Sequence, residues 1–252
     1  MNTATKTDVG AIPPLDHDEA MRLAATEYQR FLAMLDTFED DDWGRATDCE
    51  GWAVNDVAAH NLGNWEMAAS VAESLKQLVI STRMAKARGI LQIDAMTAYQ
   101  VEKHAPLATA ELVRRLQATA PRAVKGRRRV PAVARRRFPV PMPPPHGTKP
   151  LGYLLDTIYT RDVWMHRVDL SRATDRPMEL TADHDGRIVA DVVAEWARNH
   201  GAPFDLTLTG DAGGRFVTGA GGDAITLDAV EFCRTLSGRA ERDGLLRTPV
   251  LF

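Results

Sequence analysis

The sequence has 252 residues, of which 44% are hydrophobic and 26% are charged, with a formal net charge of −3 at pH 7. This composition is typical of a globular protein, and the nearly balanced charge argues against a nucleic-acid binder. No stretch approaches the roughly 18 consecutive apolar residues of a membrane span, and no signal peptide is recognisable. We therefore expect a cytoplasmic protein, monomeric or homodimeric, without nucleic-acid or membrane partners. Residues 1–15 are predicted to form a disordered leader.

The sequence contains two cysteines, Cys49 and Cys233. Two cysteines far apart cannot form a disulfide framework, and their number suits a reducing cytosol. They could pair with each other, or one could bind a metal. The simplest interpretation of each is a small, partly buried apolar residue.

The spacing of apolar residues predicts amphipathic helices over residues 16–38, 54–78 and 108–125. The first two are separated by an acidic run and by a turn that ends at Gly51 and Trp52. Residues 122–150 are rich in proline and arginine, and we expect an extended loop there. If that loop binds anything, a small anion fits better than nucleic acid, because Phe138 is its one aromatic residue. Two further helices are predicted over residues 151–173 and 183–199.

After residue 200 the pattern changes to short β-rich runs over residues 204–208, 215–218 and 224–227. Glycines separate these runs and predict hairpin turns. A last helix is expected to begin at Asp228 and to end at Gly238. The predicted fold is therefore mostly α, with a four-helix bundle over residues 16–178 and a small α+β domain over residues 179–252.

Three residues of the predicted bundle could hold a metal ion. Asp162 and His166 are four positions apart, so they share one face of their helix. His60 lies close to the apolar stripe of the second helix and would meet them if the two helices are neighbours. Two histidines and one carboxylate are typical of catalytic zinc and also suit ferrous iron. The alternative is a surface hydrogen bond between Asp162 and His166, with His60 as an ordinary buried histidine.

Three sequence blocks carry a family resemblance. The first, from Asp42 to His60, includes TDCEGWAVNDVAAH; the second is TRDVWMHRVDL from Thr160 to Leu170; the third is DAVEFCRTLSGR from Asp228 to Arg239. Their motifs, "W…T.C.GW.V.D…H", "R[ED].W.HR.D" and "D…FCR.LSGR", resemble those of the mycothiol-dependent maleylpyruvate isomerase family. The blocks occur in the family's order and span nearly the whole chain. The resemblance implies an N-terminal DinB-like bundle.

The resemblance also implies a metal site and a co-substrate. The family's ligands fall on His60, Asp162 and His166, which implies zinc, with iron or nickel as alternative ions. It further implies the actinobacterial thiol mycothiol as co-substrate. The best-known isomerases have glutamate at the position of Asp162, so the shorter side chain here predicts a closer helix or a longer bond to the metal. The implied activity is that of a thiol S-transferase or a maleylpyruvate-type cis–trans isomerase acting on a small electrophile.

The remaining site residues have alternative interpretations. Asp169 is predicted to orient His166, or else to be a solvated charge. Trp52 and Trp65 are predicted to line a cofactor pocket, or else to belong to the core. Arg234 and Arg239 are predicted catalytic residues that would hold a substrate carboxylate if the C-terminal domain caps the bundle, surface placement being the simpler alternative. The alternative to an enzyme is a non-catalytic small-molecule-binding protein with a structural metal or none.

Overall fold

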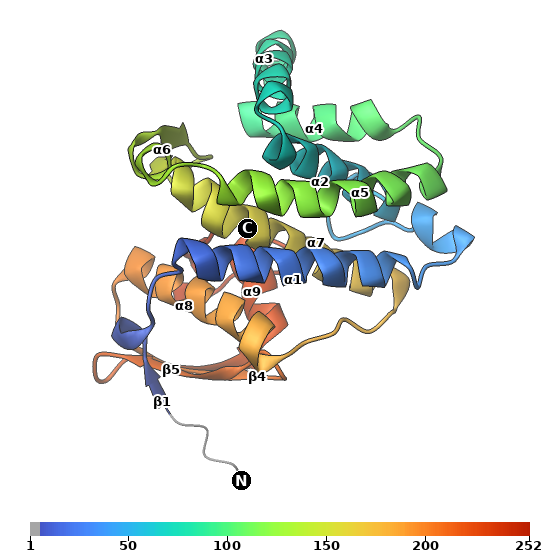
Figure 1. The fold of residues 1–252 in the computed structure, drawn as a ribbon. Helices are drawn as coiled ribbons and strands as arrows, with labels where there is room; N and C mark the ends of the chain where they lie inside the picture. The colour runs from blue at the N-terminus through green and yellow to red at the C-terminus, as the bar shows by residue number, and fades with distance from the viewer. Residues whose placement is uncertain (1–5) are drawn as a thin grey trace. The chain divides into compact units, whose positions relative to one another are not determined.

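A computed structural model describes residues 6–252, and the chain forms two compact units (Figure 1). The larger unit comprises residues 16–177 and is helical. The smaller unit combines the N-terminal segment up to residue 15 with residues 178–252, and it contains both helices and a sheet. The predicted fold class, a mostly α bundle followed by a small α+β part, is therefore confirmed.

Four helices form the bundle: α1 (His17–Leu35), α2 (Val54–Ala69), α5 (Thr109–Arg128) and α7 (Tyr159–Thr174). Helices α1 and α2 each pack against both α5 and α7. The Asp16 side chain caps α1 by accepting a hydrogen bond from the Glu19 backbone N–H at 2.7 Å. The face of α1 that the apolar spacing predicted is buried, and it contains Met21, Tyr28, Phe31 and Leu35.

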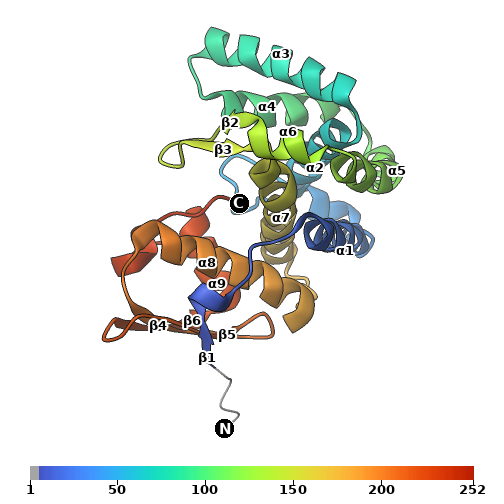
Figure 2. The same ribbon diagram turned by 60° about the vertical axis from the view of Figure 1, so that its left-hand side comes forward.

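Helices α3 (Val71–Arg88) and α4 (Gln92–His104) form a hairpin against the outer side of α2 (Figures 1 and 2). The prediction of one helix over residues 54–78 is wrong, because Ser70 has an extended backbone and its side chain caps α3. Helix α4 was not predicted, since its few buried residues include the polar Gln100 and His104. The interface with α2 is correspondingly polar: the Gln77 amide donates to the Gly63 carbonyl at 3.0 Å.

The same interface contains a cluster of Glu66, Lys103 and His104, from which we expect the stability of the fold to depend on pH in acid. Burial alone would raise the pKa of Glu66, but hydrogen bonds from His104 and Lys103 lower it to about 2, from 4.5. The ionised form therefore stabilises the fold above pH 4.5, and this contribution disappears as the pH falls through about 2.

We expect the free energy of unfolding of Glu66→Gln to depend less on pH than that of the wild type between pH 4.5 and 2. Urea unfolding at several pH values measures this slope. Glu102→Gln, which removes an exposed ion pair with Arg88, is the control. An unchanged slope in the Glu66 variant would contradict the assignment.

The region 122–150 is more regular than predicted. Helix α5 continues past Pro121 to Arg128, and Ala123 and Arg127 in this last part are buried. Helix α6 (Ala132–Arg137) follows, and strands β2 (Pro139–Pro141) and β3 (Thr148–Pro150) then pair antiparallel. The prolines of these strands are tolerated because a two-stranded sheet consists only of edge strands. The expectation of one extended loop is therefore wrong.

Helices α5 and α2 approach closely at Gly126. A Cβ atom on this residue would lie 2.0 Å from the backbone oxygen of Ala68. Gly126→Ala is therefore expected to lower the free energy of unfolding by about 1–3 kcal/mol, although alanine favours helices. Urea denaturation measures the change. Gly44→Ala, where a Cβ would meet no atom within 4 Å, is the control, and equal stability of the two variants would contradict the prediction.

The smaller unit has a four-stranded sheet in the order β1-β5-β4-β6. Its strands are β1 (Lys6–Asp8), β4 (Phe204–Thr209), β5 (Gly214–Thr218) and β6 (Asp223–Asp228). Helices α8 (Arg187–His200) and α9 (Ala229–Ser237) lie over one face of the sheet (Figures 1 and 2). Trp196 of α8 contacts Phe204 and Phe232 in the core between them.

Two expectations for this unit are wrong. Residues 6–8 form a strand parallel to β5 instead of a disordered leader, and residues 1–5 lie outside the described part. Strands β4 and β5 form the predicted hairpin, but β6 pairs parallel with β4. Gly222 permits this crossover, because a Cβ there would lie 1.9 Å from the Pro203 carbonyl oxygen.

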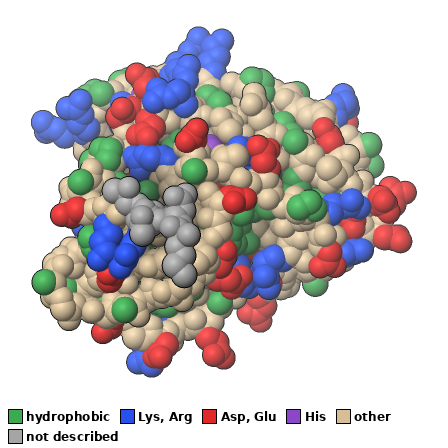
Figure 3. All heavy atoms as spheres, turned by 90° about the horizontal axis from the view of Figure 1, so that it is seen from below, with side chains coloured by type: hydrophobic (Ala, Val, Ile, Leu, Met, Phe, Trp, Pro, Cys, Tyr) green, Lys and Arg blue, Asp and Glu red, His purple; other side chains and the backbone are tan. Residues whose placement is uncertain are grey.

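Short 3₁₀ and π segments complete the chain: η1 (Val9–Ala11), η2 (Asp40–Gly44), η3 (Tyr153–Ile158), η4 (Ala182–Gly186) and η5 (Gly244–Arg247). No helix within residues 6–252 is long and apolar enough to cross a membrane. On the face shown in Figure 3, basic and acidic side chains are interspersed and hydrophobic side chains occur in small groups.

Candidate metal centre

Helices α2 and α7 bring His60, Asp162 and His166 together inside the bundle. The Nε2 atom of His60 lies 3.4 Å from Asp162 Oδ2, and the Nε2 atom of His166 lies 3.4 Å from Asp162 Oδ1. Both histidines are buried, whereas the Asp162 side chain is 19% exposed to solvent. The three residues selected from the sequence are thus neighbours, and each carboxylate oxygen faces one imidazole.

These distances suit a metal better than a pair of hydrogen bonds. A typical N–H···O bond is about 2.9–3.0 Å long, shorter than the 3.4 Å found here. Two ligands with bonds of 2.0–2.1 Å around a tetrahedral ion are roughly 3.4 Å apart. The donor set of two imidazole nitrogens and a carboxylate fits zinc in both chemistry and spacing. The shorter side chain of Asp162, compared with glutamate, still reaches both histidines.

The pKa shifts of the site show that it favours positive charge. Burial alone would raise the pKa of Asp162, but His166 and His60 lower it well below its usual value. Burial alone would lower the pKa of His166, but Asp162 and hydrogen bonds with Asp169 and Cys49 raise it well above its usual value. A carboxylate held ionised between two imidazoles is the electrostatic environment that a divalent cation requires.

A tight turn ahead of α2 positions two further residues. The Trp52 backbone N–H donates to the Cys49 carbonyl at 2.9 Å, and Gly51 between them has a φ of +78°, which favours glycine. The turn places the Trp52 ring 5.2 Å from the His60 ring and 6.1 Å from the His166 ring, measured between centroids. Trp65 instead stacks on Tyr28 at 4.3 Å in the core.

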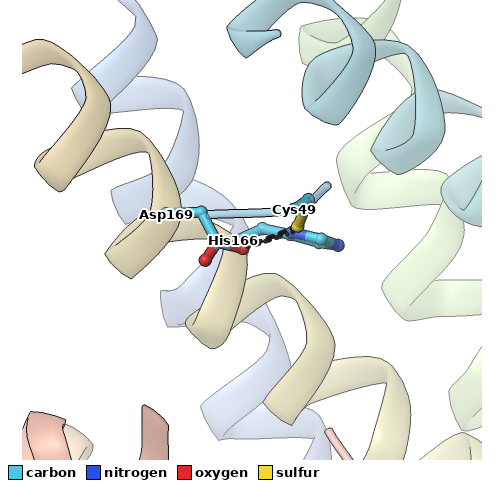
Figure 4. Close-up of side chains that lie close together, drawn as sticks. All are labelled: Cys49, His166 and Asp169. Atoms are coloured by element: carbon cyan, nitrogen blue, oxygen red, sulfur yellow. Dashed lines mark hydrogen bonds and ion pairs between the residues drawn. The ribbon is translucent and has the colours of Figure 1, made fainter. Parts of the chain in front are cut away.

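Cys49 and Asp169 lie on the Nδ1 side of His166 (Figure 4). Asp169 Oδ2 is 3.0 Å from His166 Nδ1 and accepts a hydrogen bond from the Cys49 thiol at 3.3 Å. Asp169 is fully buried, so the alternative of a solvated charge is wrong. With a proton held on Nδ1, the Nε2 atom beside Asp162 is the one available to bind a metal. Neither cysteine forms a disulfide, and Cys49 has polar partners that its sequence context did not indicate.

Sequence reasoning also missed Asn64. Its amide donates to Asp162 Oδ2 at 3.2 Å, which holds that oxygen on the side of His60. Asn64 follows His60 by four residues on α2, so the spacing that linked Asp162 to His166 would also have found it.

Asp169→Asn is expected to weaken metal affinity about 10- to 100-fold, because the amide holds the His166 ring less firmly. Competition with a chromophoric chelator measures this affinity. Asp175→Asn is the control, since Asp175 is 92% exposed and asparagine tolerates its left-handed backbone. Equal affinities in the two variants would show that Asp169 does not support the site.

The two arginines selected from the sequence belong to the smaller unit. Arg234 is buried, so the simpler expectation of surface placement is wrong for it. Its guanidinium donates to the Glu231 carboxylate at 2.6 Å and to the Arg239 carbonyl at 3.2 Å. Arg239 is half-buried. Binding of a substrate carboxylate by these arginines stays a prediction.

Comparison with known proteins adds an independent line of evidence. Residues 24–171 match the family model described as mycothiol maleylpyruvate isomerase N-terminal domain. Among solved structures, the crystal structure of the mycothiol-dependent maleylpyruvate isomerase is 19% identical, covering 93% of this chain and 92% of that chain, with a TM-score of 0.57. A mutant of that enzyme is 18% identical, with the same coverage and TM-score. At this identity the two structures show a shared fold. No curated protein matches the sequence.

Proposed function

The chain belongs to the mycothiol maleylpyruvate isomerase family, and from this premise we propose that it is a zinc-dependent enzyme that activates mycothiol toward a small electrophile. The observation that carries the proposal is the placement of His60 and His166 around the two Asp162 oxygens at 3.4 Å. Three protein ligands are typical of catalytic zinc sites, which keep one position for water or substrate.

A zinc ion held by His60, Asp162 and His166 would supply the positive charge that stabilises a thiolate at neutral pH. The chain's own residues prepare this site. Asp169 accepts from His166 Nδ1 at 3.0 Å and so fixes the ring that faces Asp162. Asn64 steadies the Asp162 carboxylate, and the Trp52 ring shields the two histidines on one side.

The shared chemical step is addition of the thiolate sulfur to an electrophilic carbon. With a cis double bond conjugated to a carbonyl, the new S–C bond converts the double bond to a single bond and moves the electron pair onto the carbonyl oxygen. Rotation about that single bond and expulsion of the thiolate give the trans isomer and regenerate the thiol. With a leaving group on the carbon, the S–C bond forms as that group departs, and the product is a thioether.

The decisive assay incubates zinc-loaded protein with mycothiol and maleylpyruvate, and in parallel with an epoxide and an alkyl halide. We expect thiol-dependent conversion of at least one of them: isomerisation leaves the mycothiol concentration unchanged, whereas S-transfer consumes it. Absorbance follows the isomerisation, and mass spectrometry detects adducts. An absence of thiol-dependent conversion with all three electrophiles would overturn the proposal.

A further inference from the structure

A buried cation close to the candidate site has no carboxylate partner. Arg127 of α5 is fully buried, and its guanidinium donates to the Leu155 carbonyl at 2.8 Å, the Tyr28 hydroxyl at 3.0 Å and the Thr160 hydroxyl at 2.8 Å. All three acceptors are neutral, and Arg127 forms no ion pair within residues 6–252. A buried charge without a counter-charge is costly, so an anion that enters nearby would be favoured.

Two tyrosines connect this cation to the candidate metal centre. The Arg127 Cζ atom lies 5.8 Å from the ring centroids of both Tyr28 and Tyr159. Tyr159 precedes Asp162 by three residues and His166 by seven on α7, so it lies on the helix face that carries both. Burial, followed by the effects of Tyr28 and Asp162, raises the pKa of Tyr159.

The hydroxyl groups of both tyrosines can donate a further hydrogen bond. The Tyr28 hydroxyl accepts from Arg127, but in the described part of the chain its own proton has no acceptor, although the residue is 99% buried (1% exposed). The Tyr159 hydroxyl forms no hydrogen bond with any residue from 6 to 252. Burial also raises the pKa of Tyr28, so both hydroxyls are protonated donors at neutral pH. Two hydroxyl donors beside a buried guanidinium that forms no ion pair in the described part of the chain are an arrangement that can bind an anion.

We propose that Tyr28 and Tyr159 donate hydrogen bonds to a carboxylate of the substrate, with Arg127 as the positioning residue that holds Tyr28 and supplies the positive charge. A carboxylate matches this set because it offers two acceptor oxygens and one negative charge. The inference rests on the proposed function, since the carboxylate would belong to the electrophile that meets the thiol. It adds the residues that select a carboxylate-bearing electrophile over an uncharged one.

The test uses the zinc-loaded full chain, with maleate and its uncharged dimethyl ester as probes. Isothermal titration calorimetry gives the affinities for the wild type, Tyr28→Phe, Tyr159→Phe and the double variant. Tyr99→Phe on α4 is the matched control. Each single variant at Tyr28 or Tyr159 is expected to bind maleate about tenfold more weakly, which is the loss of one hydrogen bond to a charged group. Affinity for the ester should not change.

Tyr159→Phe is the deciding variant, because its hydroxyl has no protein partner and its removal breaks no internal bond. Thermal unfolding checks that Tyr28→Phe is folded. Unaltered maleate affinity in Tyr159→Phe, or no saturable maleate binding by the wild type, would overturn the inference.

Zinc content and thiol turnover, measured on the same preparations, separate this inference from the proposed function. Loss of maleate binding in the tyrosine variants of a protein without thiol turnover would support the anion site alone. Thiol turnover with equal maleate affinity in all variants would support the enzyme and exclude this carboxylate site.

Discussion

Replacing His166 with alanine is expected to remove the bound metal and, with it, thiol-dependent turnover. The histidine contributes one of three candidate ligands, and its Nε2 lies 3.4 Å from Asp162 Oδ1. Two remaining ligands bind zinc weakly. The zinc affinity should therefore fall by more than the roughly 10- to 100-fold that is typical when a residue hydrogen-bonded to a ligand is replaced. Elemental mass spectrometry should find close to one zinc per chain in the wild type and almost none in the variant.

His60→Ala should behave in the same way, because His60 faces the other oxygen of the same carboxylate. His146→Ala, in the turn between β2 and β3, should keep its zinc and serves as the matched histidine control. Circular dichroism confirms that each variant remains helical. Zinc bound equally well by both site variants, or wild-type protein that takes up no zinc after loading, would refute the metal site. A ligand-binding bundle would then be the working model.

Arg167→Met is expected to lower the free energy of unfolding by about 3–5 kcal/mol. Arg167 on α7 forms a buried ion pair with Glu27 on α1, and both side chains are almost completely inaccessible to solvent. Methionine fills much of the same volume but leaves the Glu27 carboxylate without this counter-charge in a low-dielectric interior. The loss of stability therefore comes more from the unpaired Glu27 carboxylate than from lost packing. Urea unfolding followed by circular dichroism measures the change.

Arg172→Met is the matched control on the same helix, since Arg172 pairs with Asp48 at 2.8 Å and its side chain is 48% exposed. A pair this accessible contributes only about 0–1 kcal/mol. The double variant Glu27→Leu with Arg167→Met should recover part of the stability, because no unpaired charge remains. If Arg167→Met is no less stable than Arg172→Met, the buried pair does not hold α1 to α7.

The bundle helices could be predicted because their buried faces are apolar at helical spacing, as in the stripe of α1 that includes Tyr28 and Phe31. Helix α4 could not, since Gln100 and His104 replace apolar residues on its buried face. Strand β1 was missed because three residues without an apolar alternation are recognisable only through their pairing with β5.

The candidate ligands were found because Asp162 and His166 lie four residues apart and His60 lies close to the apolar stripe of its helix, and the family motifs fall on the same three residues. Their proximity to one another depends on how α2 and α7 pack, which no local pattern contains. The partners of Cys49 and Arg127 could not be predicted for the same reason. Their partners, Asp169 for the thiol and Tyr28 for the guanidinium, are about 100 residues or more away in the chain.

The pairing of β1 with β5 also determines the order in which the molecule can be completed during synthesis. Strand β1 is synthesised before the bundle, but its partner β5 follows roughly 200 residues later, after the whole bundle. The bundle can therefore fold while strand β1 is still unpaired. The smaller unit folds last, because its sheet depends on contacts between residues far apart in the chain. A fusion or cleavage near residue 6 would disturb the sheet at that final step and leave the earlier helices intact.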